Sequence, residues 1–137
     1  MKTCLKLATC CIAIGMVTTA FKANNSMYQK GTLRVFENKN YQVLDSTGFY
    51  IYSRYEPQEV NKGKGLIMET EYFFSKNGNS NIKQLTIRNI ENEFSENVRF
   101  RYLLEEEFCR DNELTAYDKY LHVYKLEYLY RESLKQP

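Results

Sequence analysis

The feature that most constrains the fold of this chain is a change in hydrophobic periodicity at Thr86. Before it, from Gly31 to Ser75, apolar residues mostly alternate with polar ones, which is the pattern of strands that bury one face. After it, apolar residues recur every three or four positions, which is the pattern of amphipathic helices. Strands followed by helices within one short chain predict an α+β domain.

The first half of the pattern predicts an antiparallel meander of three or four strands. The residues between these strands favour turns; Asp45 and Gly48, for example, take the first and last positions of a predicted type I turn. Pro57 is expected to end the third strand, because proline cannot donate a hydrogen bond to a ladder. The expected strands are Thr32–Phe36, Tyr41–Leu44, Phe49–Tyr55 and Leu66–Ser75.

The second half predicts three helices. Thr86 is expected to cap a short first helix, and Ser95 is expected to cap the second. The third is expected to run from about Asp111 to Ser133, where apolar side chains three and four residues apart form one stripe. The members of this stripe are Leu114, Tyr117, Leu121, Tyr124 and Tyr128. Phe108 and Leu121 lie centrally on their stripes, so we expect both in the core.

The segment from Met1 to Ala20 predicts a secretory signal peptide. Lys2 and Lys6 give the segment a basic start, an apolar run follows, and small residues precede the expected cleavage point after Ala20. The apolar run is shorter than the roughly 20 residues that a membrane-spanning helix needs. We therefore expect an exported protein, either periplasmic or secreted.

Three alternatives to this cleavage remain open at the level of sequence. The leader could be cut after Ala23, kept as an uncleaved anchor, or lipidated at Cys10 or Cys11. After the leader, the polar residues 21–30 predict a flexible lead, and residues 31–137 predict a single α+β domain.

Charge and cysteine content exclude several classes of protein. Without Lys2 and Lys6, the 19 basic residues fall to 17, which equals the 17 Asp and Glu residues. A neutral surface gives no electrostatic reason to bind nucleic acid or anionic lipid, and no membrane span is expected after cleavage. Cys109 is the only cysteine after the leader, so we expect no internal disulfide and a small buried side chain at this position, with a disulfide between two chains as the alternative.

The sequence contains no recognisable catalytic set. His122 is the only histidine; Asp118, four residues earlier, could orient it as a base, but a surface or boundary histidine is the expected role. One His and one Cys cannot supply the three or four ligands of a zinc site. Cys109 and His122 are expected to lie too far apart to form a nucleophilic pair. We therefore expect no enzyme and assign no catalytic, cofactor-binding or metal-ligating residue.

The tyrosines are the main functional signal, since the chain has 12 Tyr and 8 Phe but no Trp. Tyr50 and Tyr52 share one face of an expected strand, and Tyr120 and Tyr130 lie on the expected third helix. Rings that are not needed in the core favour grooves and interfaces, where the hydroxyl stays wet. These four residues form the candidate binding surface, although burial of the rings as core residues remains open.

The function expected from this surface is that of a small interaction module. Its partner would be another protein, a component of the cell envelope or a second copy of the chain. The alternative is a small-molecule or glycan-binding protein with an aromatic pocket between the sheet and the helices. A hydrolase that uses His122 is the third hypothesis.

The helical half also resembles a known group of proteins. The segments concerned are Thr86–Phe94, Phe100–Phe108, Glu113–Lys119 and Tyr124–Lys125. They are similar to a pattern in small, uncharacterised exported proteins of Bacteroidetes-type bacteria. The resemblance implies a bacterial exported protein, and it transfers no active-site residue.

Overall fold

The computed structural model describes residues 29–60, 63 and 65–135. The predicted signal peptide, residues 1–20, lies outside the described residues, as do residues 21–28 of the predicted lead. Among the residues described, no helix has the length and apolar character that a membrane crossing requires.

The first half of the described chain forms one antiparallel sheet. Its strands are β1 (Leu33–Phe36), β2 (Lys39–Asp45), β3 (Tyr50–Glu59), β4 (Leu66–Ser75) and β5 (Lys83–Gln84). Each strand pairs with its neighbour in sequence, so the order in the sheet is β1-β2-β3-β4-β5. The predicted meander is confirmed, and the short strand β5 extends it beyond the expected three or four strands.

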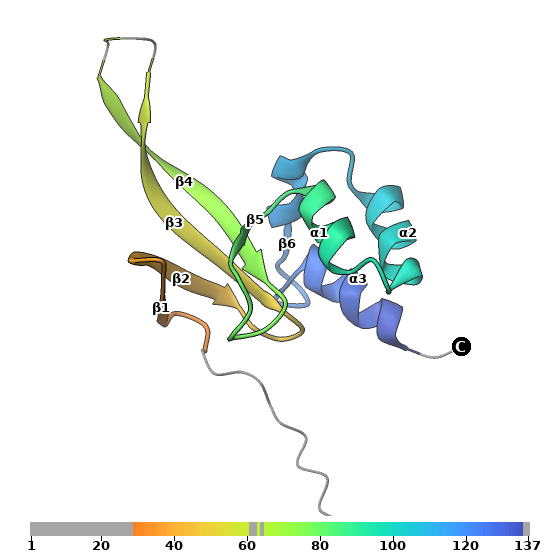
Figure 1. Ribbon diagram of the computed structural model, residues 1–137. Coiled ribbons are helices and arrows are strands. Elements are labelled where there is room, and N and C mark those ends of the chain that lie inside the picture. The colour runs from red at the N-terminus through yellow and green to blue at the C-terminus, as the bar shows by residue number, and fades with distance from the viewer. Residues whose placement is uncertain (1–28, 61–62, 64, 136–137) are drawn as a thin grey trace, which may run out of the picture.

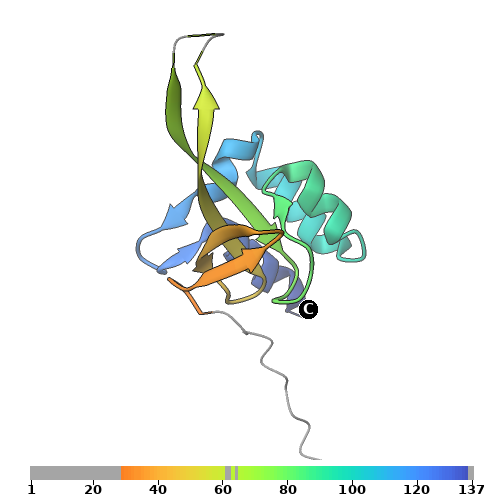
Figure 2. The ribbon, with the colours of Figure 1, turned by 60° about the vertical axis from the view of Figure 1, so that its left-hand side comes forward.

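The second half supplies the helices, which gather on one side of the sheet next to the turn between β2 and β3 (Figures 1 and 2). The elements are α1 (Ile87–Glu93), α2 (Val98–Glu107), the 3-10 helix η1 (Asp111–Thr115), the short strands β6 (Tyr117–Asp118) and β7 (Val123–Tyr124), and α3 (Lys125–Leu134). This strands-then-helices order confirms the α+β class.

Helices α1 and α2 begin where side chains can accept hydrogen bonds from free backbone N–H groups. Thr86 caps α1 as predicted, since its hydroxyl accepts from the N–H of Asn89 at 3.2 Å. The cap of α2 is Asn97 rather than Ser95, and its Oδ1 accepts from the N–H of Phe100 at 2.9 Å.

The main core lies between the sheet and the helices. The rings of Phe49, Phe94 and Phe100 form its centre, and the centroids of the last two are 5.4 Å apart at right angles. The buried members are Phe49, Ile51, Phe74, Leu85, Ile90, Phe94, Phe100, Leu104, Phe108, Leu114, Leu126 and Leu129. Aromatic and aliphatic side chains thus make up this core.

A second core lies on the opposite face of the same sheet. Its buried members are Tyr41, Val43, Tyr50, Tyr52 and Phe73. Arg34 of β1 closes this core: its guanidinium donates to the Tyr52 hydroxyl at 2.7 Å, to Ser75 Oγ at 2.9 Å and to the Ser80 carbonyl at 2.6 Å. The buried guanidinium thus joins the first strand to the last long strand and to the turn that follows it.

The prediction of one long third helix is wrong. Residues 117–124 form a small hairpin between η1 and α3. The carboxylate of Asp118 accepts hydrogen bonds from the N–H groups of Tyr120 and Leu121, and His122 takes a positive φ of 53°, so the chain turns here. As a result Leu121 is 58% exposed and does not belong to the core.

The prediction that Pro57 ends the third strand is also wrong. β3 continues through Pro57 to Glu59, and Pro57 pairs with Met68 of β4. Its missing N–H faces away from β4, which is the position where a strand tolerates proline. β3 and β4 therefore continue together beyond the rest of the sheet as a two-stranded projection, the β3–β4 arm, formed by residues 54–59 and 66–71 (Figure 1).

Phe108 and Leu121 provide a matched test of this packing. Phe108→Ala should lower the free energy of unfolding by about 3–5 kcal/mol, because a buried ring leaves a cavity. Leu121→Ala should change it by less than about 0.5 kcal/mol, because the side chain is mostly exposed. Urea unfolding of both variants measures the two values, and similar large losses would contradict the hairpin.

Candidate functional site

The structure places Tyr50 and Tyr52 inside the second core, which corrects their assignment to a binding surface. Their exposed fractions are 2% and 0%, and their rings stack with centroids 5.9 Å apart. The Tyr52 hydroxyl lies 2.8 Å from Ser75 Oγ, and burial raises the pKa of this hydroxyl above its ordinary value. Neither ring reaches the surface, because β1 and β2 fold over this face of β3.

Tyr120 and Tyr130 lie in two different places. Tyr120 is 96% exposed in the hairpin between β6 and β7. Tyr130 of α3 is half-buried against the main core, with its ring centroid 5.1 Å from that of Phe94 and 5.2 Å from that of Phe100. The structure therefore does not bring the four predicted tyrosines together into one surface.

A sequence signal for the burial of Tyr50 and Tyr52 exists in the strand itself. The run from Phe49 to Tyr52 is apolar at every position rather than at alternate positions. A strand that lacks polar alternation is typical of burial on both faces.

His122 and Cys109 are both exposed, so the expectation of a buried Cys109 is wrong. The N–H of Cys109 donates to Glu113 Oε2 at 2.8 Å in the connection between α2 and η1. Across the described residues, no group of three or more His, Cys, Asp and Glu side chains is placed to hold a metal ion.

The most unusual buried group is the carboxyl of Glu127 on α3, which has no exposed surface. Its Oε1 accepts a hydrogen bond from the N–H of Phe49 at 3.2 Å. The carboxyl lies directly against the turn between β2 and β3: a Cβ at Gly48 would stand 2.6 Å from Glu127 Oε2 and 2.8 Å from the Tyr130 ring. Only glycine fits at this contact between the sheet and α3.

Burial and charge both favour the protonated form of Glu127. Loss of water raises its pKa to about 8, and the nearby Asp45 carboxylate adds to the rise. The N–H groups of Phe49 and Gly48 and the charge of Arg131 act in the opposite direction but do not offset the burial. This carboxyl joins the sheet to α3.

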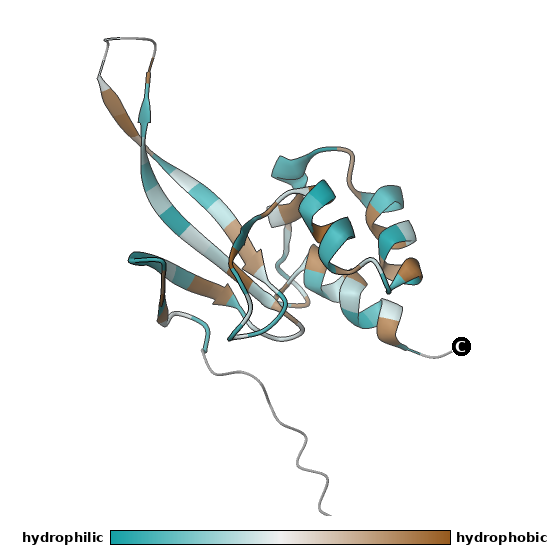
Figure 3. Cartoon of the chain, in the orientation of Figure 1, coloured by the Kyte–Doolittle hydropathy of each residue, from teal (hydrophilic) through white to brown (hydrophobic). Residues whose placement is uncertain are grey.

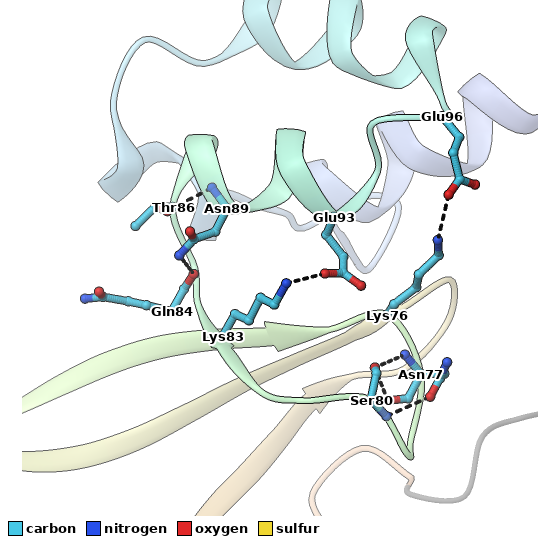
Figure 4. Close-up of polar contacts among 9 residues, drawn as sticks. All are labelled: Lys76, Asn77, Ser80, Lys83, Gln84, Thr86, Asn89, Glu93 and Glu96. Atoms are coloured by element: carbon cyan, nitrogen blue, oxygen red, sulfur yellow. Dashed lines mark hydrogen bonds and ion pairs between the residues drawn. The ribbon is translucent and has the colours of Figure 1, made fainter.

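An aromatic hollow of about 430 Å³ lies between the end of β4 and the helices, where Tyr130 and Phe94 form part of the wall. Lys76 at its edge lies 4.0 Å from Glu96 and 5.8 Å from the Phe94 ring centroid. Figure 4 shows Lys76 reaching toward Glu96, while a second ion pair, Lys83 with Glu93 at 2.5 Å, joins β5 to α1. Apart from Lys76, which follows β4, its lining residues belong to the helical half.

Exposed apolar side chains of the sheet lie on the β3–β4 arm and, in smaller number, on β1, where Leu33 and Val35 are exposed. Every second residue of its strands continues the face that forms the main core, since Ile51 and Phe74 belong to that core. On the arm this face presents Tyr55, Leu66 and Met68, which are 68%, 68% and 63% exposed. Figure 3 shows the apolar segment of β4 near the tip, away from the helices.

The opposite face of the arm is charged. Glu56, Glu69 and Glu71 share it with Arg54, which forms an ion pair with Glu56 and stacks 4.9 Å from the Phe73 ring centroid. Gln58 also lies on this face and donates to Glu71 Oε1 at 2.8 Å. Apart from the exposed Ile67, this face is polar, so the arm is amphipathic.

A smaller hollow of about 260 Å³ lies at the base of the arm. Thr70 and Tyr72 of β4 line one side, and Asp111 and Asn112 of η1 line the other. The Asp111 carboxylate accepts a hydrogen bond from the N–H of Ile87 at 2.8 Å, which fixes η1 beside the start of α1. The arm and this hollow together form the candidate binding site.

The comparisons with known proteins add no relative. No protein-family model matches the chain, and searches of curated proteins and of solved structures found no similar protein. The site is therefore interpreted from its own geometry.

Glu127 predicts a specific pH dependence of stability. Its pKa is about 8 in the folded protein and near 4.5 when unfolded, so its contribution is complete below pH 4.5 and is lost as pH rises to 8. Glu127→Gln should remove a slope of up to about 1.4 kcal/mol per pH unit between these values. Urea unfolding from pH 4.5 to 9 measures the slope, and parallel curves for the two proteins would contradict the assignment.

Proposed function

We propose that this chain is an interaction module that binds a protein partner through the apolar face of the β3–β4 arm. The observation that carries this proposal is the exposure of Tyr55, Leu66 and Met68 on one face of a projecting hairpin. Burial of such side chains contributes about 25 cal/mol per Å² of apolar surface, so an exposed group of them favours association.

The proposed binding surface includes Tyr55 of the arm in place of Tyr50 and Tyr52, which the sequence had suggested. Tyr50 and Tyr52 are enclosed by β1 and β2, whereas Tyr55, on the same strand, lies beyond the part of β3 that pairs with β2. An aromatic ring with a wet hydroxyl beside aliphatic side chains is typical of the centre of a protein interface. The proposal therefore keeps an aromatic interaction surface and moves it to the arm.

The alternative is the binding of a small molecule or glycan in the hollow beside Tyr130. Its volume of about 430 Å³ supports this alternative, because ligand pockets start at about 300 Å³. However, the Tyr130 ring packs against Phe49, Phe94 and Phe100, so much of its surface already belongs to the core. The arm offers more exposed apolar surface and is the favoured site.

The place of action is also a proposal. A leader with the basic start and small-residue end of Met1–Ala20 supports export to the periplasm or the medium. The resemblance of the helical half to small exported proteins of Bacteroidetes-type bacteria supports the same location. A partner would then be an exported or envelope protein.

Photo-crosslinking in the organism that makes this protein tests the role of the arm. Benzoylphenylalanine in place of Tyr55 should give a discrete adduct with another protein. The same group in place of Tyr102 on α2, which is equally exposed at 68%, is the matched control and should give none. Equal adducts from both positions, or none from Tyr55, would overturn the proposal.

A double variant shows whether the apolar face is responsible. Leu66→Ser with Met68→Ser should reduce the Tyr55 adduct at least about tenfold, because the central apolar contacts of an interface dominate its affinity. Thermal unfolding should change little, since both side chains are mostly exposed. An adduct of unchanged yield would place the contact elsewhere.

A further inference from the structure

We infer that the partner adds an extended segment as a new strand along β4, between Leu66 and Thr70, and that this segment alternates apolar and basic side chains. The inference rests on the proposed function of the arm and specifies how the arm binds. Three observations support it: the open edge of β4, the proline on the other edge, and the distribution of charge.

The outer edge of β4 is open over this stretch. In the described part of the chain β5 pairs with β4 only at Phe73 and Phe74. The N–H of Leu85 donates to the Tyr72 carbonyl at 2.9 Å, so the backbone groups of Tyr72 face this edge. The backbone N–H and C=O groups of successive residues point to opposite edges of a strand. The groups of Thr70, Met68 and Leu66 therefore face the same edge as those of Tyr72, in the part of β4 that β5 does not reach.

A hydrogen bond near the tip of the arm independently shows which backbone groups of β4 face outward. The N–H of Val60 donates to the Gly65 carbonyl at 3.1 Å, so Gly65 faces β3 and Leu66 faces outward. An exposed row of N–H and C=O groups is a template for another strand. An extended peptide backbone can form hydrogen bonds with all of these groups.

The other edge of the arm is blocked. β2 pairs with β3 as far as Ser53, and Pro57 lies on the free part of that edge without an N–H to donate. Proline on an edge strand is a known means of preventing strand addition. Only β4 therefore has a complete set of donors and acceptors on the arm.

Charge and side-chain alternation define the added segment. Its side chains on one face would lie beside Leu66 and Met68, and those on the other beside Glu69 and Glu71. Apolar side chains suit the first face, and Lys or Arg suits the second, because opposite charges on neighbouring strands stabilise a sheet. The hollow at the base of the arm contains Glu71 and Asp111 and no basic residue in its lining, which again favours a basic side chain.

The same charges disfavour a second copy of this chain as the partner. In two β4 strands paired antiparallel around Met68, Glu69 of each copy would lie opposite Ile67 of the other, and the two Glu69 carboxylates would lie diagonally across the joined edge. β4 has no basic side chain to offset these charges. A different protein with basic residues at alternate positions avoids this repulsion.

Mapping of the adduct tests the identity of the segment. Benzoylphenylalanine at Tyr55 is crosslinked as above, the adduct is digested, and mass spectrometry identifies the linked peptide. We expect a stretch in which apolar residues alternate with Lys or Arg. An acidic segment, apolar residues with helical spacing, an adduct between two copies of this chain, or an adduct with lipid would overturn the inference.

Two matched pairs of variants test the geometry. Met68→Pro removes both the methionine side chain and the outward N–H, whereas Met68→Ala removes the side chain and keeps the N–H. The adduct yield should be at least about tenfold lower for Met68→Pro than for Met68→Ala. Glu69→Lys should lower the yield in the same way, and Glu106→Lys on α2, also exposed, should not. Thermal unfolding identifies any variant that fails to fold. If Met68→Pro does not fold, the comparison of Glu69→Lys with Glu106→Lys tests the inference.

The two proposals fail in different ways. No protein adduct at Tyr55 would overturn the role of the arm and this inference together. An adduct that is lost with Leu66→Ser and Met68→Ser but is equal for Met68→Pro and Met68→Ala would keep the arm and overturn strand addition.

Discussion

The burial of β3 on both faces is the constraint on which the rest of the structure depends. Phe49 and Ile51 pack against the helices, and Tyr50 and Tyr52 pack under β1 and β2, so one strand belongs to two cores. Different elements pack over each core. Helices α1, α2 and α3 pack on one face of the sheet, and the hairpin of β1 and β2, with Arg34, packs on the other. Because both covers end near Ser53, the continuation of β3 and β4 is left uncovered.

Glu127 holds the helical layer in register with the sheet. Its carboxyl accepts a hydrogen bond from the N–H of Phe49, the residue just before β3, and Gly48 leaves just enough room for it. A buried carboxyl without full hydrogen bonding is costly, and protonation reduces this cost. The protonated carboxyl thus stabilises the contact between α3 and the sheet, and this makes the contact sensitive to pH.

The arm is a consequence of unequal strand lengths. β3 and β4 are each 10 residues long, whereas β2 has 7 and β5 has 2, so the neighbouring strands cannot cover them. Pro57 protects one exposed edge, and nothing comparable protects β4 within the described residues. An amphipathic hairpin with one open edge is well suited to bind an extended chain, since backbone bonds supply affinity and alternate side chains supply selectivity.

Local patterns in the sequence determined the order of strands and helices, the cap at Thr86 and the burial of Phe108, because these depend on neighbours along the chain. The split of the third helix depended on Asp118 and His122, whose turn conformation overrode a helical stripe. The candidate site was decided only by tertiary structure. Tyr50 lies in the apolar run Phe49–Tyr52, whereas Tyr55 lies between Arg54 and Glu56, so the sequence indicates that their surroundings differ. Only the structure shows that β2 pairs with β3 as far as Ser53 and stops short of Tyr55. Which stretch of a strand is covered depends on the lengths and curvature of its neighbours in space, and periodicity along the chain carries no information about them.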